Sequence, residues 1–286
     1  MSTQITEAFV EQYKSNVFHL AQQKGSRLRG AVKSETVTGT SHYFERIGAT
    51  AAQLRQGGRH SSTPQINTPH SRRKVTLADY DWADLIDQED KVRMLISPTS
   101  EYAKAGAYAM GRAMDDAIIA AASGNAFTGV AGATSSALPA GQKIAVGTTS
   151  LTVAKLIAAK EIIDAADVDP DETKYLVCSA KEITSLLGDD KVTSADYNSV
   201  KALVAGQIDS FMGFNFIRTE RIAAAGGDNL ALAFTQSALG LALGRDINTR
   251  ISERDDKNYA TQVFLSMTIG ATRVEDEKVV EIACNV

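Results

Sequence analysis

The chain has 286 residues, of which 44% are hydrophobic and 22% are charged, a composition typical of folded proteins rather than disordered or fibrous ones. No stretch approaches the roughly 20 consecutive apolar residues that cross a bilayer, and the polar start lacks the features of a signal peptide. We therefore expect a protein made in the cytosol, without a membrane partner. Its two cysteines, Cys178 and Cys284, lie far apart in apolar runs and are expected to be buried free thiols.

The net charge of −4 conceals two segments of opposite sign. Residues 46–74 contain six basic and no acidic residues: Arg46, Arg55, Arg59, Arg72, Arg73 and Lys74. Residues 79–90 contain six acidic and no basic residues: Asp79, Asp81, Asp84, Asp87, Glu89 and Asp90. Such runs form either two solvated faces or two surfaces that attract each other between copies of the chain.

The first quarter of the chain is rich in polar residues. Residues 4–24 have the apolar spacing of an amphipathic helix, and residues 26–42 are predicted to form an extended arm rather than a core element. Two extended runs, 42–51 and 71–78, flank a long polar tip with two glycines and two prolines. Because this tip has very few apolar residues, it has no core of its own; it is either ordered by another chain or disordered in the isolated subunit.

The next segments are predicted to be helical. Residues 81–96 place apolar side chains at helical spacing, and a longer helix is predicted over 98–123, with Ser97 as N-cap and Pro98 in the first turn. Its many alanines and glycines allow close approach of neighbouring elements, which is typical of a structural strut.

The remainder alternates helices and strands and then becomes β-rich, which favours a mixed sheet flanked by helices in a separate lobe. Residues 125–142 are predicted to be a flexible connection. Helices are predicted over 151–166, 180–187 and 195–205, and strands over 143–146, 174–179, 214–219, 230–234, 259–271 and 278–284. In residues 259–271 apolar side chains occupy alternate positions, as in a strand with two distinct faces.

The chain has none of the common catalytic or phosphate-binding motifs, and its histidines (His19, His42, His60, His70) have no cysteine or carboxylate cluster at metal spacing. Asp115 and Asp116 point about 100° apart on a helix, so one of them is expected to cap or pair with a neighbouring element. The acidic run 167–172 lacks the spacing of a calcium loop and is interpreted as a solvated turn. The sequence therefore predicts no catalytic, cofactor-binding or metal site.

The order of these parts resembles the major capsid proteins of tailed bacteriophages with the Hong Kong 97-type fold. The resemblance covers nearly the whole chain. It is carried by short stretches at 73–80, 86–87, 98–102, 111–115, 251–259 and 270–274, including Pro98-Thr99-Ser100-Glu101-Tyr102 and Gly111-Arg112-Ala113-Met114-Asp115.

The resemblance implies an α+β fold with five parts. These are an N-terminal arm (1–41), an extended E-loop (42–80), a peripheral domain with a spine helix at 98–123 (81–140), an axial domain (141–245) and strands that return to the peripheral domain (246–286). It also implies that the E-loop lies over a neighbouring subunit, so that the six basic residues contact the six acidic ones of another copy.

The implied function is structural: self-assembly into hexamers and pentamers of an icosahedral head that encloses double-stranded DNA, with no cofactor and no enzymatic activity. The implied partners are a separate scaffolding protein, since the chain starts directly at the arm, a portal, a decoration protein and non-specifically bound packaged DNA. The protein would be assembled in the host cytoplasm and reside in the virion, without covalent cross-links, because Lys74 is the only lysine of the loop. Two alternatives remain: an encapsulin-like shell around a cargo enzyme, and an α/β enzyme with its site in residues 141–245.

Overall fold

A computed structural model describes residues 22–55, 57, 60–87, 99–188, 210–222, 224–225 and 228–285. The chain divides into two compact units. Unit 1 comprises Met1–Ser26, Ala78–Met114 and Gly244–Ile269, and unit 2 comprises Arg27–Leu77, Asp115–Leu243 and Gly270–Val286. The helices predicted over 4–24 and 195–205 lie outside the described residues, apart from residues 22–24, which are not helical.

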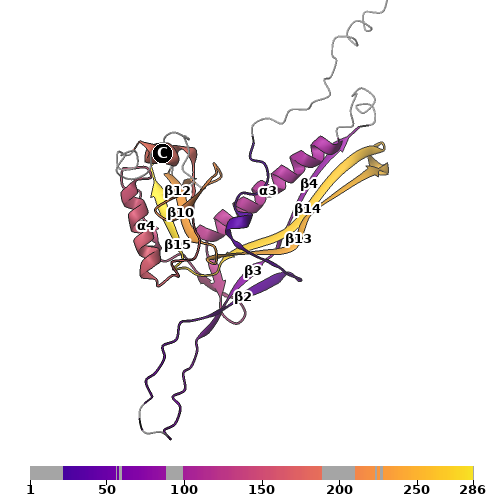
Figure 1. Cartoon of the computed structure of the whole chain (residues 1–286). Coiled ribbons are helices and arrows are strands. Elements are labelled where there is room, and N and C mark those ends of the chain that lie inside the picture. The colour runs from indigo at the N-terminus through magenta and orange to yellow at the C-terminus, as the bar shows by residue number, and fades with distance from the viewer. Residues whose placement is uncertain are drawn as a thin grey trace, which may run out of the picture. The chain divides into compact units, whose positions relative to one another are not determined.

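Unit 1 combines one helix with long strands. The helix is α3 (Thr99–Ser123), which confirms the predicted strut over its described part, and the strands are β4 (Ala78–Ile86), β14 (Ala260–Arg273) and β13 (Leu239–Arg254). They are ordered β13-β14-β4 in one sheet, and α3, β13 and β14 continue into unit 2 (Figure 1). Among the described residues, no helix combines the length and hydropathy needed to cross a membrane.

Small residues allow α3 to lie close to its neighbours in unit 1. A Cβ atom built on Gly106 would lie 2.7 Å from Leu265 Cδ1 and from Trp82 Cε3, so only glycine fits without a shift. A Cβ on Gly111 would lie 2.6 Å from the Cα atom of Gly25. The helix thus packs on the sheet through one glycine and on the arm residues through the other.

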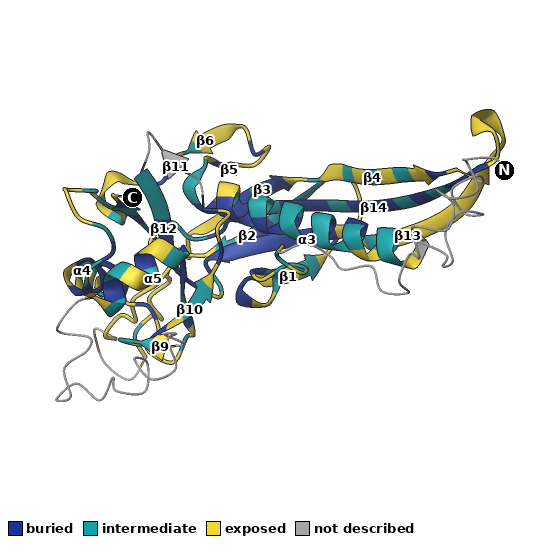
Figure 2. Cartoon of the chain, turned by 90° about the horizontal axis from the view of Figure 1, so that it is seen from above, coloured by how far each residue is buried: buried dark blue, intermediate teal, exposed yellow. Residues whose placement is uncertain are grey.

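The alternation predicted for the last long strand is confirmed in β14. Val263, Leu265, Met267 and Ile269 are at most 1% exposed, whereas the residues between them are half-buried (Figure 2). Because successive side chains of a strand point to opposite faces, β14 presents one fully apolar face to the core.

The helix predicted over residues 81–96 is wrong in its described part, which forms β4 instead. Antiparallel pairing joins β4 to β14, with Trp82 opposite Leu265 and Ile86 opposite Thr261. The spacing of Trp82, Leu85 and Ile86 fits a helical stripe, but tertiary pairing with β14 decides the structure. Residues 88–98, including the predicted N-cap Ser97 and first-turn Pro98, lie outside the described residues.

Unit 2 is built on a mixed seven-stranded sheet, as the alternation of predicted helices and strands indicated. The main order is β7-β15-β12-β8-β10-β9, and β11 pairs with β12. The strands are β7 (Lys143–Ile144), β8 (Lys174–Cys178), β9 (Ser210–Phe211), β10 (Phe214–Arg218), β11 (Ala224–Ala225), β12 (Asp228–Thr235) and β15 (Val279–Cys284).

Two helices belong to this lobe, α4 (Val153–Ala165) and α5 (Ala180–Leu187). Leu156 and Ile163 of α4 share one buried apolar cluster with Val280 and Ile282 of β15. The Ser179 side chain accepts a hydrogen bond from the Glu182 amide and caps α5, and the helix ends before Gly188 as predicted.

A second, four-stranded sheet in unit 2 has the order β2-β3-β5-β6, with β2 (Ser41–Ile47), β3 (His70–Thr76), β5 (Ala126–Thr128) and β6 (Thr134–Ser136). The prediction that residues 125–142 are a flexible connection is therefore wrong. Those residues form β5, β6 and a short 3-10 helix (Ala140–Gln142). Their order depends on pairing of β5 with β3, some fifty residues earlier, which local composition cannot reveal.

The extended arm predicted over 26–42 is also corrected in part. A 3-10 turn (Arg29–Ala31) and β1 (Lys33–Thr36) occupy this segment, and Leu28, Ala31, Val32 and Val37 are at most 5% exposed. β1 pairs in parallel with residues 240–243 of β13. The segment is thus part of the core of unit 2, held by contacts with residues about two hundred positions later.

The last two strands, β14 and β15, belong to different sheets. β14 pairs with β4, whereas β15 pairs with β12 and β7 in the seven-stranded sheet. Residues 279–284 therefore differ from the expectation that the whole of 246–286 returns to the sheet of β14. Cys178 and Cys284, in β8 and β15, are free and buried as predicted.

Candidate assembly surfaces

The loop between β2 and β3 extends from unit 2 without a core of its own. The two strands pair from Ser41 with Thr76 to Ile47 with His70, and the Gly48 amide then donates to the Pro69 carbonyl at 2.9 Å. We call β2 and β3 the loop base and residues 48–69 the loop tip. Almost all described tip residues are exposed, including Leu54 at 87%. The predicted absence of a core in this segment is therefore confirmed.

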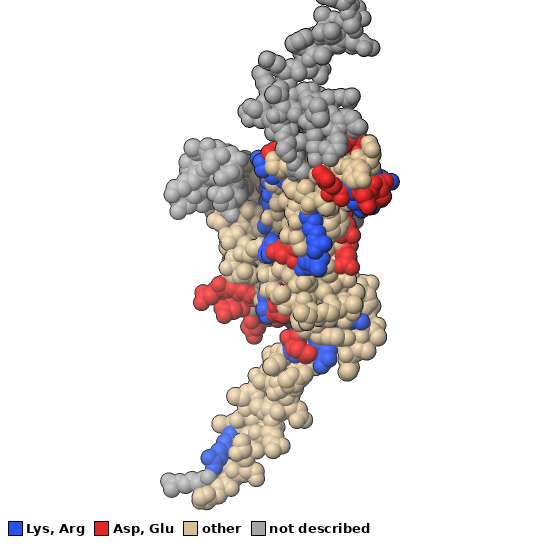
Figure 3. All heavy atoms as spheres, turned by 90° about the vertical axis from the view of Figure 1, so that its right-hand side faces the viewer, with Lys and Arg blue, Asp and Glu red and all other residues tan. Residues whose placement is uncertain are grey.

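The basic residues of this segment gather at the loop base. Arg46, Arg72, Arg73 and Lys74 all belong to β2 or β3, and Arg55 is the single basic residue of the tip that the structure describes. On the face seen in Figure 3 the tip is uncharged apart from one basic group. Arg59 lies outside the described residues. The described part of the tip thus presents mainly uncharged side chains, while the basic residues lie at the loop base. Counting charges over the whole segment did not reveal this difference.

Arg73 is a buried structural residue. It is 3% exposed, and its guanidinium donates to Asp276 Oδ2 at 2.5 Å. Burial lowers the pKa of Arg73, although Asp276 acts in the opposite direction. Its ion pair is satisfied within unit 2, so Arg73 fixes the loop base rather than offering its charge to another chain.

Asp276 also binds Arg273, which is fully buried and donates from Nε to Asp276 Oδ1 at 2.5 Å. The Arg273 guanidinium donates further to the carbonyl oxygens of Ala122 at 3.0 Å and Gly124 at 2.6 Å, at the end of α3 where carbonyls lack helical partners. We call these three residues the Arg73–Asp276–Arg273 cluster. The sequence analysis missed it, although an arginine at the end of an apolar strand beside an acidic turn was a usable signal.

The other basic residues of the loop base have weaker or partly exposed contacts. Arg46 donates to the Val274 carbonyl at 2.7 Å, and Arg72 lies 3.4 Å from Glu45 and 5.3 Å from the centroid of the Tyr43 ring. In the tip, Arg55 is exposed and donates to Ser61 Oγ at 3.0 Å.

Lys74 has a packing role at the loop base. Its side chain lies against Gly132, where an added Cβ would approach Lys74 Cδ to 2.4 Å. Its aliphatic stem therefore covers the turn between β5 and β6.

The acidic residues lie along β4 in unit 1. Asp79, Asp81 and Asp87 are exposed, and Asp84 is half-buried on the alternate face with Trp82. Asp79 accepts a hydrogen bond from Thr268 Oγ1 at 2.6 Å, and Asp84 accepts one from the Leu85 amide at 2.8 Å. Glu89 and Asp90 lie outside the described residues. The sequence-predicted residues thus form an acidic strand of unit 1 and a basic loop base of unit 2.

Both residues of the Asp115-Asp116 pair have structural roles in unit 2, whereas the sequence analysis expected such a role for one of them. Asp115 is fully buried and accepts hydrogen bonds from the amides of Arg27 at 3.0 Å and Leu28 at 3.1 Å. Asp116 forms an ion pair with Arg221. The two carboxylates act on different elements and do not converge on a shared atom.

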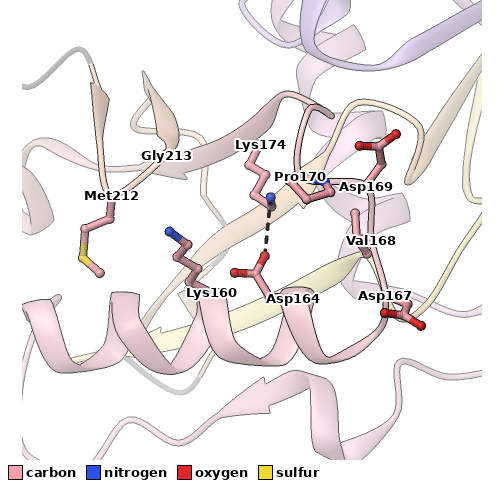
Figure 4. Close-up of a pocket in the computed structure, with 9 residues that line it drawn as sticks. All are labelled: Lys160, Asp164, Asp167, Val168, Asp169, Pro170, Lys174, Met212 and Gly213. Atoms are coloured by element: carbon pink, nitrogen blue, oxygen red, sulfur yellow. Dashed lines mark ion pairs between the residues drawn. The ribbon is translucent and has the colours of Figure 1, made fainter.

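A hollow of about 510 Å³ in the α/β lobe lies beside the acidic run 167–172. Lys174 Nζ lies 3.4 Å from Asp164 Oδ1 there, and Figure 4 shows Lys160 near this pair while Asp167 and Asp169 point elsewhere. Within the described ranges, no group of three or more His, Cys, Asp or Glu side chains could hold a metal ion.

A carboxylate and both thiols are buried in the core of the same lobe. Glu182 is fully buried; its Oε2 accepts from the Ser179 amide at 2.7 Å, and its Oε1 has no hydrogen-bond partner. Burial raises the pKa of Glu182 and raises the pKa of Cys178 and of Cys284 to about 12. Thiols with such values are protonated and unreactive at neutral pH.

Comparisons with solved structures identify the fold. The capsid of the cyanophage P-SCSP1u superimposes with a TM-score of 0.75 and 18% identity, covering 100% of this chain and 96% of that one. The capsid of Ralstonia phage GP4 gives 0.77 and 11% identity, covering 97% and 96%. The capsid of the cyanophage Pam1 gives 0.70 and 14% identity, covering 100% and 98%.

At sequence level, a search of curated proteins finds no match. The family described as "Phage capsid protein", in contrast, matches residues 5–286. This match covers nearly the whole chain, and the architecture is the α+β fold of the phage capsids it resembles. The chain therefore belongs to the phage capsid protein family and is a structural major capsid protein of a phage head, a component of the virion.

Proposed function

We propose that the chain self-assembles into hexamers and pentamers of an icosahedral head that encloses double-stranded DNA, and that it has no enzymatic activity. The observation that carries this proposal is the loop tip. Some twenty residues extend from a well-packed base, with Leu54 at 87% and Ile66 at 42% exposure and no core of their own. A loop of this length without a core of its own is typical of a segment that contact with another chain orders, which supports a surface covered by another copy.

The partner surface that we propose for the loop is the acidic strand β4 of a neighbouring copy. Asp79 and Asp81 are exposed on it and Asp87 directly after it, and Leu85, on the same face of the strand, is 43% exposed. Opposite charges would steer the two surfaces together, while apolar contacts of the tip supply most of the strength, since exposed ion pairs contribute only about 0–1 kcal/mol each.

Within the basic set, Arg55 and Arg72 are the best candidates for this contact. Arg55 is exposed in the tip, and Arg72 is held by a partly exposed 3.4 Å pair to Glu45 and a contact with the Tyr43 ring. Arg46, Arg59 and Lys74 remain candidates. We propose Arg73 instead as a stabiliser of the loop base because its guanidinium is bound to Asp276.

The domain organisation that we propose follows the Hong Kong 97-type fold, with an arm (1–41), an E-loop (42–80), a peripheral domain containing α3, and an axial domain from residue 141 onward. Residues 246–273 belong to the peripheral domain in this scheme. We include β15 in the axial domain because it pairs with β12 and β7.

Further partners are proposed on the grounds of the function alone: a scaffolding protein, a portal, a decoration protein and non-specifically bound packaged DNA, with assembly in the host cytoplasm. The hollow beside Asp164 is lined by Lys160, Lys174, Asp164, Asp167 and Asp169, together with Val168, Pro170, Met212 and Gly213.

Electron microscopy of the purified full-length protein tests the proposal. We expect closed shells of uniform size, and particles isolated from infected or expressing cells should contain DNA. Particles that contain a single enzyme species instead of DNA would favour an encapsulin-like shell. A monodisperse monomer under all assembly conditions, with and without a scaffolding protein, would overturn the proposed function.

A further inference from the structure

The long strand β13 has an outer edge with which no strand of the described residues pairs over its second half. β1 covers only residues 240–243, and beyond them β13 has β14 on one side and no described strand on the other. Side chains of residues 244–254 are exposed on both faces, apart from the half-buried Ile247, and Ile251 is 55% exposed (Figure 2). All of these residues belong to unit 1. An open edge of eleven residues is a template for pairing with another chain.

The sequence of this edge is complementary to itself when two copies run antiparallel. If the two-fold axis passes through Thr249, Arg245 of each copy lies opposite Glu253 of the other, and Ile247 lies opposite Ile251. Opposite charges, apolar pairs and a Thr–Thr pair are the cross-strand neighbours that stabilise antiparallel sheets. Neither Arg245 nor Glu253 has an ion-pair partner among the described residues, so both are available for the contact.

Neighbouring registers also bring opposite charges together, Asp246 with Arg250 about Asn248 and Asp246 with Arg254 about Arg250, but neither pairs one apolar residue with another. An axis through Arg250 would place two guanidinium groups directly opposite each other. An axis through Asn248 would place Ile251 against Arg245 and leave Glu253 without an opposite charge. Like charges that face each other across strands are destabilising, and of the three registers the one centred on Thr249 alone pairs Ile247 with Ile251 and places no like charges opposite each other, which favours it.

We propose that residues 244–254 of β13 pair with the same residues of a second copy of this chain, antiparallel and about a two-fold axis at Thr249. Such a contact is isologous: Arg245 of the first copy contacts Glu253 of the second, and Glu253 of the first contacts Arg245 of the second. An interface of this kind joins two copies and is then complete. Charged residues on an edge ordinarily discourage pairing with foreign strands. Here they restrict pairing to this one partner and register.

The inference rests on the assembly of many copies proposed above, because one strand pair alone is a small interface. Two subunits joined at this edge would form one continuous sheet that passes from unit 1 of one copy to unit 1 of the next. A closed shell contains many two-fold relations at which such a pair can form.

A cysteine at the axis tests the proposal. Opposite residues of an antiparallel pair have Cα atoms about 4.5 or 5.5 Å apart, and both values fit a disulfide. Thr249→Cys shells under mild oxidation should therefore give a band at twice the chain mass of 30.5 kDa on non-reducing gels. The native Cys178 and Cys284 are buried, with pKa values of about 12, and contribute no background.

Ser252→Cys is the matched control, since it lies on the same exposed edge but would be about 20 Å from its own counterpart. It should give little dimer. Reversal of one charge, by Arg245→Glu or by Glu253→Arg in the Thr249→Cys background, should slow cross-linking about tenfold, because like charges then face each other at both ends. The double reversal should restore the rate.

The outcomes separate the two proposals. Shells that form normally but in which Thr249→Cys cross-links no faster than Ser252→Cys would overturn the strand pairing alone. Failure of the double reversal to recover the rate lost in the single variants would do the same. Absence of any shell from the unsubstituted chain would overturn the proposed function instead.

Discussion

One carboxylate, Asp276, balances two buried guanidinium groups in unit 2. Arg73 belongs to the loop base and Arg273 holds the last carbonyls of α3, so the cluster joins the root of the loop to the end of the longest helix. The cluster keeps a net positive charge, and its stability depends on the one residue that neutralises part of it. Removal of one member of a buried ion pair leaves an uncompensated charge, which is far more costly than loss of an exposed pair.

Asp276→Asn should therefore lower the free energy of unfolding by about 3–5 kcal/mol, as measured by urea titration. Asp256→Asn is the matched control, because the Arg254–Asp256 pair is exposed on both sides. That variant should leave the urea midpoint nearly unchanged. Equal effects of the two substitutions would contradict a structural role of the cluster.

Glu182 provides a prediction of pH dependence. Burial raises its pKa in the folded protein above the unfolded value of about 4.3. Below the unfolded value both states bind the proton; as pH rises toward the folded pKa, the unfolded state loses its proton first, so the folded state becomes less stable. Glu182→Gln, which can still accept from the Ser179 amide, removes this loss.

We expect Glu182→Gln to be more stable than the unsubstituted chain at pH 7 and the difference to shrink as pH falls toward 4. The measurement is the urea midpoint of both proteins across this range. Glu161→Gln, on the exposed side of α4, should show no such pH-dependent gain. A gain that grows at low pH would contradict the burial argument.

At the scale of elements, the contrast between α3 and β4 shows which signals in a sequence suffice. Local periodicity and end signals predicted α3, α4, α5 and the two-faced β14, because each of these elements carries a clear pattern in its own residues. β4, β5 and the segment around Leu28 were mispredicted because distant partners determine them. Trp82 and Ile86 fit either period until β14 pairs with them, and the amide of buried Leu28 donates to Asp115, 87 positions later.

The same limit applies to the assembly surfaces. Counting charges located the basic and acidic segments, and the scarcity of apolar residues predicted a loop without a core. The charge count could not distinguish Arg73, which is buried, from Arg55, which is exposed. Nor could it reveal the open edge of β13, because an edge is defined by the strands that are missing beside it.

The glycine of α3 that faces the sheet gives an element-scale prediction. Gly106→Leu should destabilise unit 1 by about 1–3 kcal/mol despite the better helix propensity of leucine, because the added atoms meet Trp82 and Leu265. Thermal denaturation measures the effect. Lys104→Leu, exposed on the same helix, should cause a much smaller change. Equal stability of the two variants would show that the close approach at Gly106 is unimportant.

At the scale of the whole molecule, folding and assembly should depend on different parts of the chain. The loop tip makes few contacts within its own subunit, so its removal costs the folded subunit little. If another copy covers it in the shell, its removal should abolish or severely impair assembly.

Replacement of residues 49–68 by Asn-Gly, a pair that suits a tight hairpin turn, tests this separation. The shortened chain should keep its thermal midpoint within a few degrees while the yield of shells in electron micrographs falls at least tenfold. A control with the same twenty residues replaced by a flexible Gly/Ser segment should also fold and fail to assemble. Normal shells from either variant would contradict the proposed role of the tip.

The Arg73–Asp276–Arg273 cluster also has a consequence for the timing of synthesis. Arg73 and Asp276 are separated by 203 positions in the chain, so a ribosome adding about 5–20 residues per second makes the second residue roughly 10–40 s after the first. Throughout that interval the loop base lacks its anchoring carboxylate, and the end of α3 lacks the arginine that holds it. A nascent chain therefore cannot complete the root of its loop until it is almost finished.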